Sequence, residues 1–213
     1  MNNKLKVITF SGVDGAGKST IIKIIKSKLE RKGYDIIQLR SRPQIFPILS
    51  SFSYGKKNAE DRATKSMPRT GNNISTISSL LRLMYYFLDY LIGQIYISFK
   101  YRKSSTIIIY DRYFYDYIVD PKRSNICLPE SIIKPLYKFI FKPNLNIFLY
   151  APAIDILKRK RELDEVTINY LTCKYKNLFI ELDKNSRENY VAIENTLLER
   201  TISDIMNTIN KNL

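Results

Sequence analysis

Histidine is absent from the 213-residue sequence, and cysteine occurs only twice, as Cys127 and Cys173. Without histidine the chain has no Ser-His or Cys-His nucleophilic catalysis and no histidine-based metal site. Two distant cysteines do not make a disulfide framework, which favours a reducing compartment and predicts a cytoplasmic protein. The first ten residues contain no long apolar segment and no small-residue cleavage site, so we expect no signal peptide.

Acidic residues are scarce relative to basic ones: Asp and Glu number 20, Lys and Arg number 35, and the formal net charge is +15. A basic excess of this size suits anionic ligands such as nucleotides, or an acidic membrane or nucleic-acid surface. A solvated lysine face explains it equally well. We expect small anionic ligands and no nucleic acid, and peripheral membrane contact stays open as a hypothesis.

Uninterrupted apolar segments of membrane-spanning length are also lacking. The longest apolar stretch, residues 74–103, is broken by Arg82, Asp89 and Gln94. A charge at the centre of a bilayer costs about 2.5–3.5 kcal/mol on insertion scales, so a long buried helix of a globular domain fits better than a membrane span. The hydrophobicity of this segment on all sides suggests a homodimer contact, and its basic end at 100–103 suggests a contact with a membrane surface.

Strand-like apolar segments alternate with helix-like amphipathic segments along the chain, which predicts an α/β fold with a parallel sheet. We expect strands at 5–10, 34–39, 106–110, 146–149 and 190–193. We expect helices at 20–32, 74–103, 129–142, 154–183 (as one or two) and 196–209, and a loop-rich segment at 41–73. The length and the lack of a linker indicate one domain over residues 1–213.

Residues 12–19, GVDGAGKS, match the phosphate-binding pattern G-x-x-x-x-G-K-[ST] at every fixed position. A predicted strand precedes this loop and an amphipathic helix follows it, which argues against a chance glycine-rich turn. The backbone of small residues wraps around phosphate oxygens, and the helix N-terminus adds positive charge. We expect Lys18 to reach the β- and γ-phosphates and the Ser19 hydroxyl to hold Mg²⁺. The predicted nucleotide-binding residues are Gly12, Asp14, Gly15, Ala16, Gly17, Lys18, Ser19 and Thr20.

Asp111 and Arg112 follow the β-branched strand at 106–110, at the edge where open α/β sheets place their ligands. An aspartate there can bind Mg²⁺ through water or accept a proton from a hydroxyl, and an arginine offers a two-pronged donor to a phosphate. An ordinary ion pair at a strand end is the alternative. The chain has no N-K-x-D motif and no D-x-x-G outside the phosphate loop, so a small ATP-dependent kinase is favoured over a GTPase.

The segment 10–20, FSGVDGAGKST, resembles the F-x-G-x-D-G-x-G-K-[ST]-T loop of thymidylate kinases, and the sequence Asp111-Arg112-Tyr113 resembles their D-R-Y motif. The resemblance implies a kinase (phosphotransferase) of the P-loop nucleoside/nucleotide kinase fold, with a five-stranded parallel sheet flanked by helices and with ATP and Mg²⁺ as cofactors. It also implies that Asp14 faces the sugar of the acceptor and that Arg112 binds the acceptor's phosphate.

Two further regions are placed by the same resemblance. The charged segment at about 158–166 stands where these kinases carry a lid that closes over ATP, and within it Arg159 and Arg161 are the residues chosen for phosphate. An exposed charged helix is the alternative for this segment. The acceptor-side insertion covers about residues 41–104. The residues expected to be catalytic are Lys18, Asp111, Arg112, Arg159 and Arg161, and those expected to hold the metal are Ser19 and Asp111.

The acceptor side departs from the family pattern. Where thymidylate kinases carry R-E-P-G-G-T, this chain has Arg42 and Pro43 but lacks the glutamate and the glycine pair. Where they carry a base-reading arginine in A-D-R, it has Leu88-Asp89-Tyr90, and Arg82 is the nearest substitute. The residues expected to bind the acceptor are Asp14, Arg42, Arg82, Arg112 and Tyr113.

Three functions are weighed on these residues. The leading one is transfer of the γ-phosphate of ATP to a nucleoside monophosphate or a related small anionic acceptor. The second is transfer to a hydroxyl of a nucleoside or a sugar, for instance in a surface-polysaccharide pathway, with Asp111 as the general base. The third is a nucleotide-binding sensor without transfer activity, which the retention of Lys18, Ser19, Asp111 and Arg112 argues against.

Overall fold

The computed structural model describes residues 5–47, 73–101, 105–185 and 189–212. A single parallel sheet of five strands, in the order β2-β3-β1-β4-β5, forms the centre of the molecule. The strands are β1 Lys6–Ser11, β2 Asp35–Arg40, β3 Thr106–Asp111, β4 Leu145–Tyr150 and β5 Asn189–Glu194. All five predicted strands are confirmed, each within one residue at either end of its predicted bounds.

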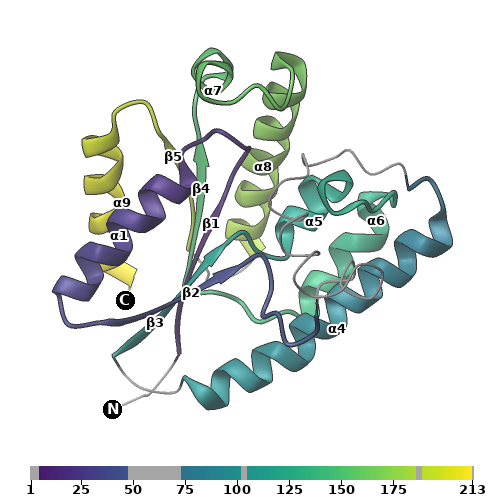
Figure 1. The fold of residues 1–213 in the computed structure, drawn as a ribbon, viewed down its shortest axis with the longest axis horizontal. Coiled ribbons are helices and arrows are strands. Elements are labelled where there is room, and N and C mark those ends of the chain that lie inside the picture. Colours follow the sequence, from purple (N-terminus) through teal and green to yellow (C-terminus); the bar gives the residue numbers. More distant parts are fainter. Residues whose placement is uncertain (1–4, 48–72, 102–104, 186–188, 213) are drawn as a thin grey trace.

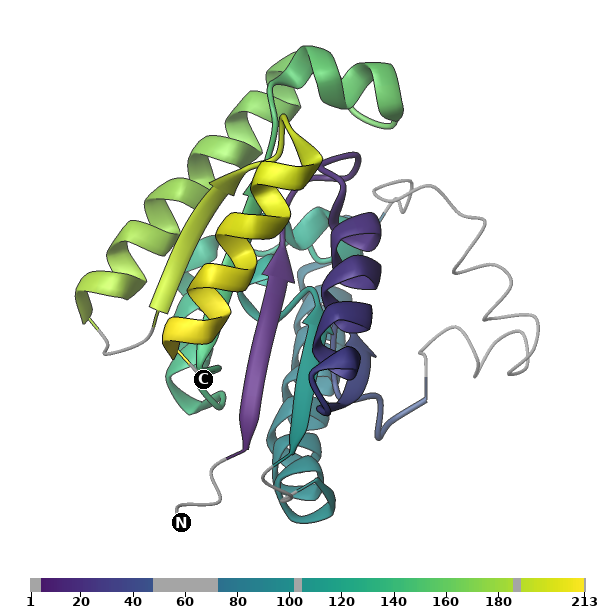
Figure 2. The ribbon, with the colours of Figure 1, turned by 90° about the vertical axis from the view of Figure 1, so that its left-hand side faces the viewer.

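Helices cover both faces of this sheet (Figure 1). On one face lie α1, Lys18–Arg31, and α9, Leu198–Asn212, which contact each other. On the opposite face lie α4, Thr76–Lys100; α5, Tyr115–Val119; α6, Glu130–Ile133; and α8, Glu165–Asn185. The short helix α7, Ala153–Arg159, follows β4 and lies above the loop between β1 and α1, as Figures 1 and 2 both show. The predicted α/β fold is confirmed.

The two faces of the sheet bury different side chains. The face under α1 and α9 is aliphatic and is formed by residues such as Ile8, Ile21, Ile109 and Ile205. The face under α4, α5 and α8 is rich in aromatic rings, for example Phe148, which stacks on Tyr175 with ring centroids 4.7 Å apart. Because both faces are covered, the central strands are mostly apolar, with Thr9 and Asn146 as buried polar residues that hydrogen-bond to each other.

Strand register places four functional segments at one edge. In the pairing of β1 with β3, Phe10 lies opposite Asp111, and in that of β2 with β3, Arg40 also lies opposite Asp111. The loop after β1, the end of β2, the residues after β3 and the start of α7 after β4 therefore lie together at the carboxyl ends of parallel strands. This is the edge at which open α/β sheets bind ligands.

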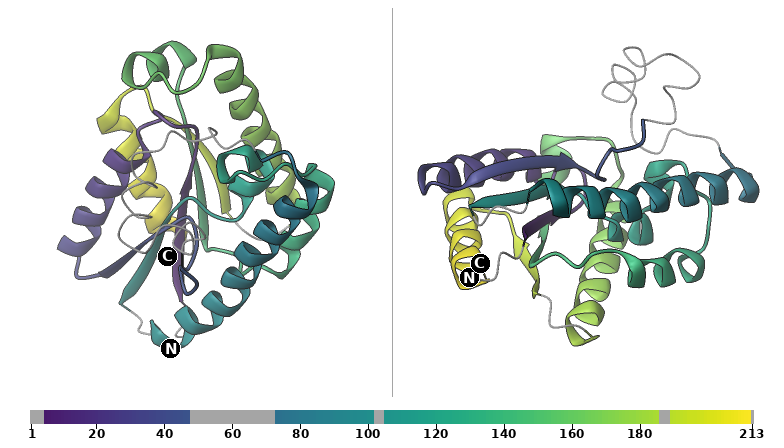
Figure 3. Two further views of the ribbon diagram at one scale, coloured as in Figure 1. Left: turned by 45° about the vertical axis from the view of Figure 1, so that its right-hand side comes forward. Right: turned by 90° about the horizontal axis from the view of Figure 1, so that it is seen from below.

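The long helix α4 is confirmed but is less buried than its composition predicts. One side packs Leu83, Phe87 and Tyr90 into the core, while the opposite side exposes large apolar residues to solvent. Figure 3 shows α4 along the outside of the molecule, away from α1 and α9. The expectation of a fully buried helix was wrong because only one layer of the fold lies against it. Among the described residues, no helix has both the length and the hydropathy needed to cross a membrane.

Two other segments differ from expectation. The predicted helix at 129–142 is a short α6 followed by the 3-10 helix η2, Lys134–Phe139, because Pro135 at its start has no N–H to continue an α-helix. The segment after Arg112 forms α5 and the 3-10 helix η1, Pro121–Ser124, which sequence periodicity did not reveal because each is less than two turns long. The expected loop-rich segment at 41–73 lies mostly outside the described residues. Its described part at 41–47 forms no helix or strand.

Candidate functional site

A cavity of about 470 Å³ opens at the carboxyl edge of the sheet. It collects residues from five separate segments of the chain: the loop after β1 and the start of α1, the end of β2, the end of β3, η1, and the end of α7. Its lining consists of Asp14, Gly15, Gly17, Lys18, Ser19, Thr20, Arg40, Asp111, Arg112, Arg123, Arg159 and Lys160. Most of the residues predicted from the two motifs therefore share one cavity.

The phosphate loop takes a backbone path that only glycine accepts at two points. Gly12 has φ of 149°, and a Cβ atom there would lie 2.2 Å from the backbone oxygen of Leu149. Gly17 has φ of 91°, and its Cβ would lie 2.3 Å from the Asn195 amide nitrogen. A side chain at either position would collide with the structure behind the loop. Both glycines are thus needed for a loop that fits closely against β4 and the end of β5.

Lys18 begins α1 and folds back over the loop. Its Nζ donates to the backbone oxygens of Gly12 at 2.8 Å and Val13 at 2.9 Å. Burial, together with the nearby positive charge of Arg112, lowers the pKa of Lys18 well below its ordinary value. A triphosphate in the cavity would offset that cost, because its negative charge favours the ammonium form.

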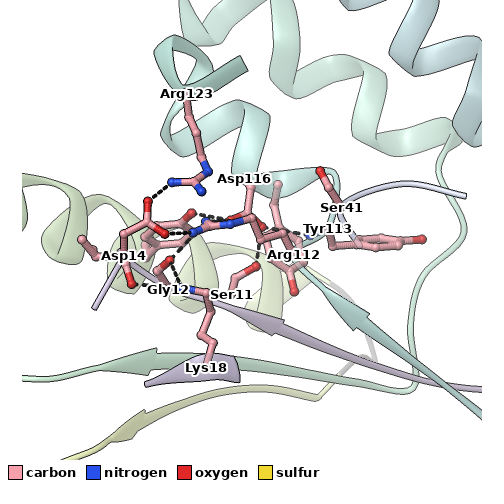
Figure 4. Close-up of polar contacts among 12 residues, drawn as sticks. Ser11, Gly12, Asp14, Lys18, Ser41, Arg112, Tyr113, Asp116 and Arg123 are labelled. Atoms are coloured by element: carbon pink, nitrogen blue, oxygen red, sulfur yellow. Dashed lines mark hydrogen bonds and ion pairs between the residues drawn. The ribbon is translucent and has the colours of Figure 1, made fainter. Parts of the chain in front are cut away.

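The guanidinium of Arg112 is held in the site by three hydrogen bonds (Figure 4). Its Nη1 donates to Asp116 Oδ1 at 2.9 Å and to the Gly12 oxygen at 3.2 Å, and its Nη2 donates to Asp14 Oδ1 at 2.7 Å. Its backbone has φ of 79°, a left-handed conformation that is uncommon outside glycine. Burial alone would lower the pKa of Arg112, but its neighbours Asp116, Tyr175 and Asp111 together outweigh burial and the pKa is raised.

Asp116 fixes this arginine in place from the first turn of α5. Its carboxylate also accepts hydrogen bonds from the Ser11 hydroxyl, from the Tyr113 backbone N–H at 2.9 Å, and from the Tyr175 hydroxyl at 2.6 Å. Ser11 ends β1 and Tyr175 belongs to α8, so one carboxylate ties three elements to the arginine. Asp116 was not among the residues expected to form the site. The signal available was its spacing of four residues from Arg112.

Three cavity residues were not predicted as site residues. Arg123 comes from η1, and its Nη1 contacts Asp14 Oδ2. Arg40 ends β2 and Lys160 follows α7, next to the predicted Arg159. Arg40 and Lys160 stand beside predicted segments, but Arg123 depends on a turn that no local pattern indicated.

Other predicted residues lie outside the cavity lining. Arg42 is buried and donates to Asp89 Oδ2 at 2.7 Å and to the backbone oxygens of Phe46 and Pro47, so it anchors the segment after β2 to α4. The Tyr113 hydroxyl donates to the Phe141 oxygen at 2.6 Å within the aromatic core. Arg82 on α4 and Arg161 in the lid segment are not part of the lining either. Gly12 and Ala16 belong to the loop behind it.

The oxygen ligands proposed for Mg²⁺ lie in the same cavity. Ser19 and Asp111 both line it, beside the phosphate loop. The described part of the chain holds no cluster of three or more Asp, Glu, Cys or His residues around one point. This donor set fits Mg²⁺, which is usually held by one or two protein oxygens together with waters and substrate phosphates.

Comparison with known proteins gives one consistent result, although no family model matches the chain. The chain is 26% identical to a probable thymidylate kinase of Thermococcus onnurineus, over 95% of this chain and 90% of that protein. It is 28% identical to a probable thymidylate kinase of Sulfolobus acidocaldarius, over 94% and 92%. The crystal structure of thymidylate kinase from Ehrlichia chaffeensis matches the fold with a TM-score of 0.56 and 16% identity, over 96% of this chain and 98% of that one.

The matches span nearly the whole chain. The strands and helices also follow one another in the order that the two sequence motifs predict. The sequence identity to these relatives is low, as expected for a chain that departs from the family pattern at Arg42 and at Leu88-Asp89-Tyr90. The chain is thus similar to thymidylate kinases over nearly its whole length and has their α/β fold, with divergence on the acceptor side.

Proposed function

We propose that this kinase transfers the γ-phosphate of ATP, with Mg²⁺, to a nucleoside monophosphate or a related small acceptor that carries a phosphate. The observation that carries the proposal is the single cavity that the phosphate loop and Arg112 line together. One end can hold a triphosphate, and the other offers a buried arginine to a second anion.

At the donor end, the loop backbone and the N-terminus of α1 would bind the phosphates of ATP. Lys18 would exchange its hydrogen bonds to the loop oxygens for the β- and γ-phosphates. Ser19 and Asp111 would hold Mg²⁺, which supplies charge neutralisation between the phosphates when bound. Arg159 and Lys160, at the end of α7, lie where they can neutralise charge on the transferred group.

At the acceptor end, Arg112 would bind the acceptor's phosphate. An oxygen of that phosphate attacks the γ-phosphorus in line, the bond from the γ-phosphorus to the bridging oxygen breaks, and ADP leaves with that oxygen. Such transfer needs positioning and charge stabilisation more than proton chemistry. A positively charged, partly buried cavity supplies both.

Transfer of labelled γ-phosphate from Mg-ATP to a panel of nucleoside monophosphates, nucleosides and sugar phosphates tests this function. Lys18→Ala and Arg112→Ala are the test variants, and Lys23→Ala and Arg31→Ala on the exposed side of α1 are the matched controls. We expect transfer to a nucleoside monophosphate that both test variants lose and both controls retain. Transfer to none of the phosphorylated acceptors would refute the proposal.

A hydroxyl acceptor is the second candidate, and the position of Asp111 in the cavity lining favours it. In that reaction Asp111 would accept the proton of an attacking hydroxyl on a nucleoside or a sugar. The same panel separates the two functions, because only the second predicts transfer to acceptors without a phosphate.

Three further sequence-based hypotheses stay predictions. A homodimer contact through α4 is consistent with its exposed apolar side. Peripheral membrane contact through the basic end of this segment concerns residues 100–103, of which 102 and 103 lie outside the described residues. The cytoplasmic location follows from the scarcity of cysteine alone.

A further inference from the structure

The carboxylate of Asp14 is held by two arginines at once. Its Oδ1 accepts from Arg112 Nη2 at 2.7 Å, and its Oδ2 is contacted by Arg123 Nη1. Figure 4 shows the two side chains reaching this carboxylate from different elements, Arg112 from the end of β3 and Arg123 from η1. Two guanidinium groups that converge on a single oxyanion form a cradle that also fits a phosphate.

The local backbone directs Arg123 into the cavity. The turn is closed by hydrogen bonds from the Arg123 N–H to the Asp120 oxygen at 3.2 Å and from the Asn125 N–H to the Lys122 oxygen at 3.0 Å. Asn125 ends η1 in a left-handed conformation, with φ of 56°. As a result the Arg123 side chain is only 22% exposed, whereas its neighbour Lys122 is exposed.

The charge balance of the cavity points to a second anion besides ATP. Its lining carries six cationic side chains, Lys18, Arg40, Arg112, Arg123, Arg159 and Lys160, against the two carboxylates of Asp14 and Asp111. Burial lowers the pKa of Arg123, so its guanidinium carries a desolvation cost that a bound anion would offset. A phosphate monoester has about −1.5 to −2 charges and three acceptor oxygens, against one charge and two oxygens for Asp14.

We propose that Arg123 is a second phosphate-binding residue of the acceptor site, and that it binds the acceptor's monophosphate together with Arg112. This inference rests on the proposed function. In it, the acceptor's phosphate takes the place of the Asp14 carboxylate between the two guanidinium groups. Asp14 then becomes available to another part of the acceptor. The acceptor is accordingly a phosphate monoester, and recognition of its phosphate is shared between the end of β3 and η1.

The test compares Arg123→Gln with Lys122→Gln, a matched control that removes the same charge from the exposed neighbour in the same turn. Binding of ATP, of the nucleoside monophosphate that the wild-type protein uses, and of the corresponding nucleoside as a competitor is measured for each. We expect Arg123→Gln to weaken binding of the monophosphate tenfold to a hundredfold, roughly the effect of one charge-assisted pair. Binding of ATP and of the nucleoside should change less than threefold, and Lys122→Gln should resemble wild type throughout.

Equal binding of the monophosphate by wild type and Arg123→Gln would overturn this assignment and leave the proposed function intact. So would equal losses for monophosphate and nucleoside, which indicate only a structural role. A wild-type protein that binds no nucleoside monophosphate would overturn both. If Arg123→Gln does not fold, Arg123→Lys replaces it, and a loss confined to the monophosphate is again the expected result because lysine keeps the charge but lacks the fork.

Discussion

The orientation of Arg112 in the site depends more on a buried network of ion pairs and hydrogen bonds than on the phosphate loop. Arg112 is useful for an anion only if its guanidinium is already oriented, and Asp116 orients it from α5. The pKa of the Tyr175 hydroxyl is raised well above its ordinary value by burial and by Asp116, so this group stays a hydrogen-bond donor to the carboxylate. The network therefore holds the Arg112 guanidinium in a fixed orientation beside a largely aromatic core.

Asp116→Asn should destabilise the protein, because it leaves the buried Arg112 without its main counter-charge. We expect a loss of about 3 kcal/mol in the free energy of unfolding, measured by urea denaturation. Asp204→Asn, in the exposed ion pair with Arg200 on α9, is the control and should change it by less than about 0.5 kcal/mol. A variant at position 116 as stable as wild type would show that the network does not depend on this charge.

Among the elements, the phosphate loop is held from behind by the loop after β5. Asn195 is 5% exposed, its Nδ2 donates to the Ala16 oxygen at 2.8 Å, and its backbone N–H donates to the Tyr150 oxygen at 2.7 Å. The side chain also fills the space next to Gly17. A residue 179 positions away in sequence thus fixes the path of the loop.

Asn195→Ala should weaken ATP binding several-fold, since it removes this support and leaves the Ala16 oxygen without its donor. A stability loss of about 1–3 kcal/mol should accompany it. Calorimetric titration with ATP and thermal unfolding measure the two effects. Asn177→Ala, an exposed asparagine on α8, is the comparison and should alter neither quantity. Unchanged ATP affinity in Asn195→Ala would contradict the supporting role.

The lid segment leads to a second prediction at the scale of elements. The sequence could not tell which of its two arginines reaches the phosphates, and the structure places them differently. Both arginines are exposed, but Arg159, which ends α7, lines the cavity and Arg161 does not. Arg159→Ala should lower kcat for phosphoryl transfer about tenfold or more, as loss of transition-state charge stabilisation does. Arg161→Ala should leave kcat within about twofold. The reverse order in steady-state kinetics would show that Arg161 is the residue that reaches the phosphates.

At the scale of the whole molecule, the outer side of α4 exposes a row of large apolar side chains. Ile77, Leu81, Leu88, Ile95 and Phe99 are each at least 43% exposed on a helix of 25 residues. Exposed apolar patches of this kind commonly mark interaction sites. The row has no charged residue within it, so a second copy related by a two-fold axis could pack against it without burying a charge.

We therefore expect a dimer in solution. Light scattering should give about twice the chain mass of 25.0 kDa. The double variant Leu88→Lys and Ile95→Lys should halve that mass, with little effect on thermal unfolding because both side chains are exposed. A monomeric wild-type protein at working concentration would contradict this expectation.

The sequence predicted the parts of the site that are local in the chain. Lys18 directly follows the loop after β1 and Arg112 directly follows a β-branched strand, so spacing alone placed them at the same sheet edge. Arg42 pairs with Asp89, 47 residues away, and local spacing in the sequence does not report a contact at that separation. Arg123 could not be found because its direction depends on a short 3-10 turn that hydrophobic periodicity does not report.

The most direct test of the account is γ-phosphate transfer from Mg-ATP to nucleoside monophosphates by wild type, Lys18→Ala and Arg112→Ala. We expect transfer by wild type and a fall of at least about 100-fold in kcat/KM in both variants, because each removes a fixed cation from the reacting phosphates. Transfer that survives in Arg112→Ala, or that goes only to acceptors without a phosphate, would contradict the account of a kinase that binds two anions in one cavity.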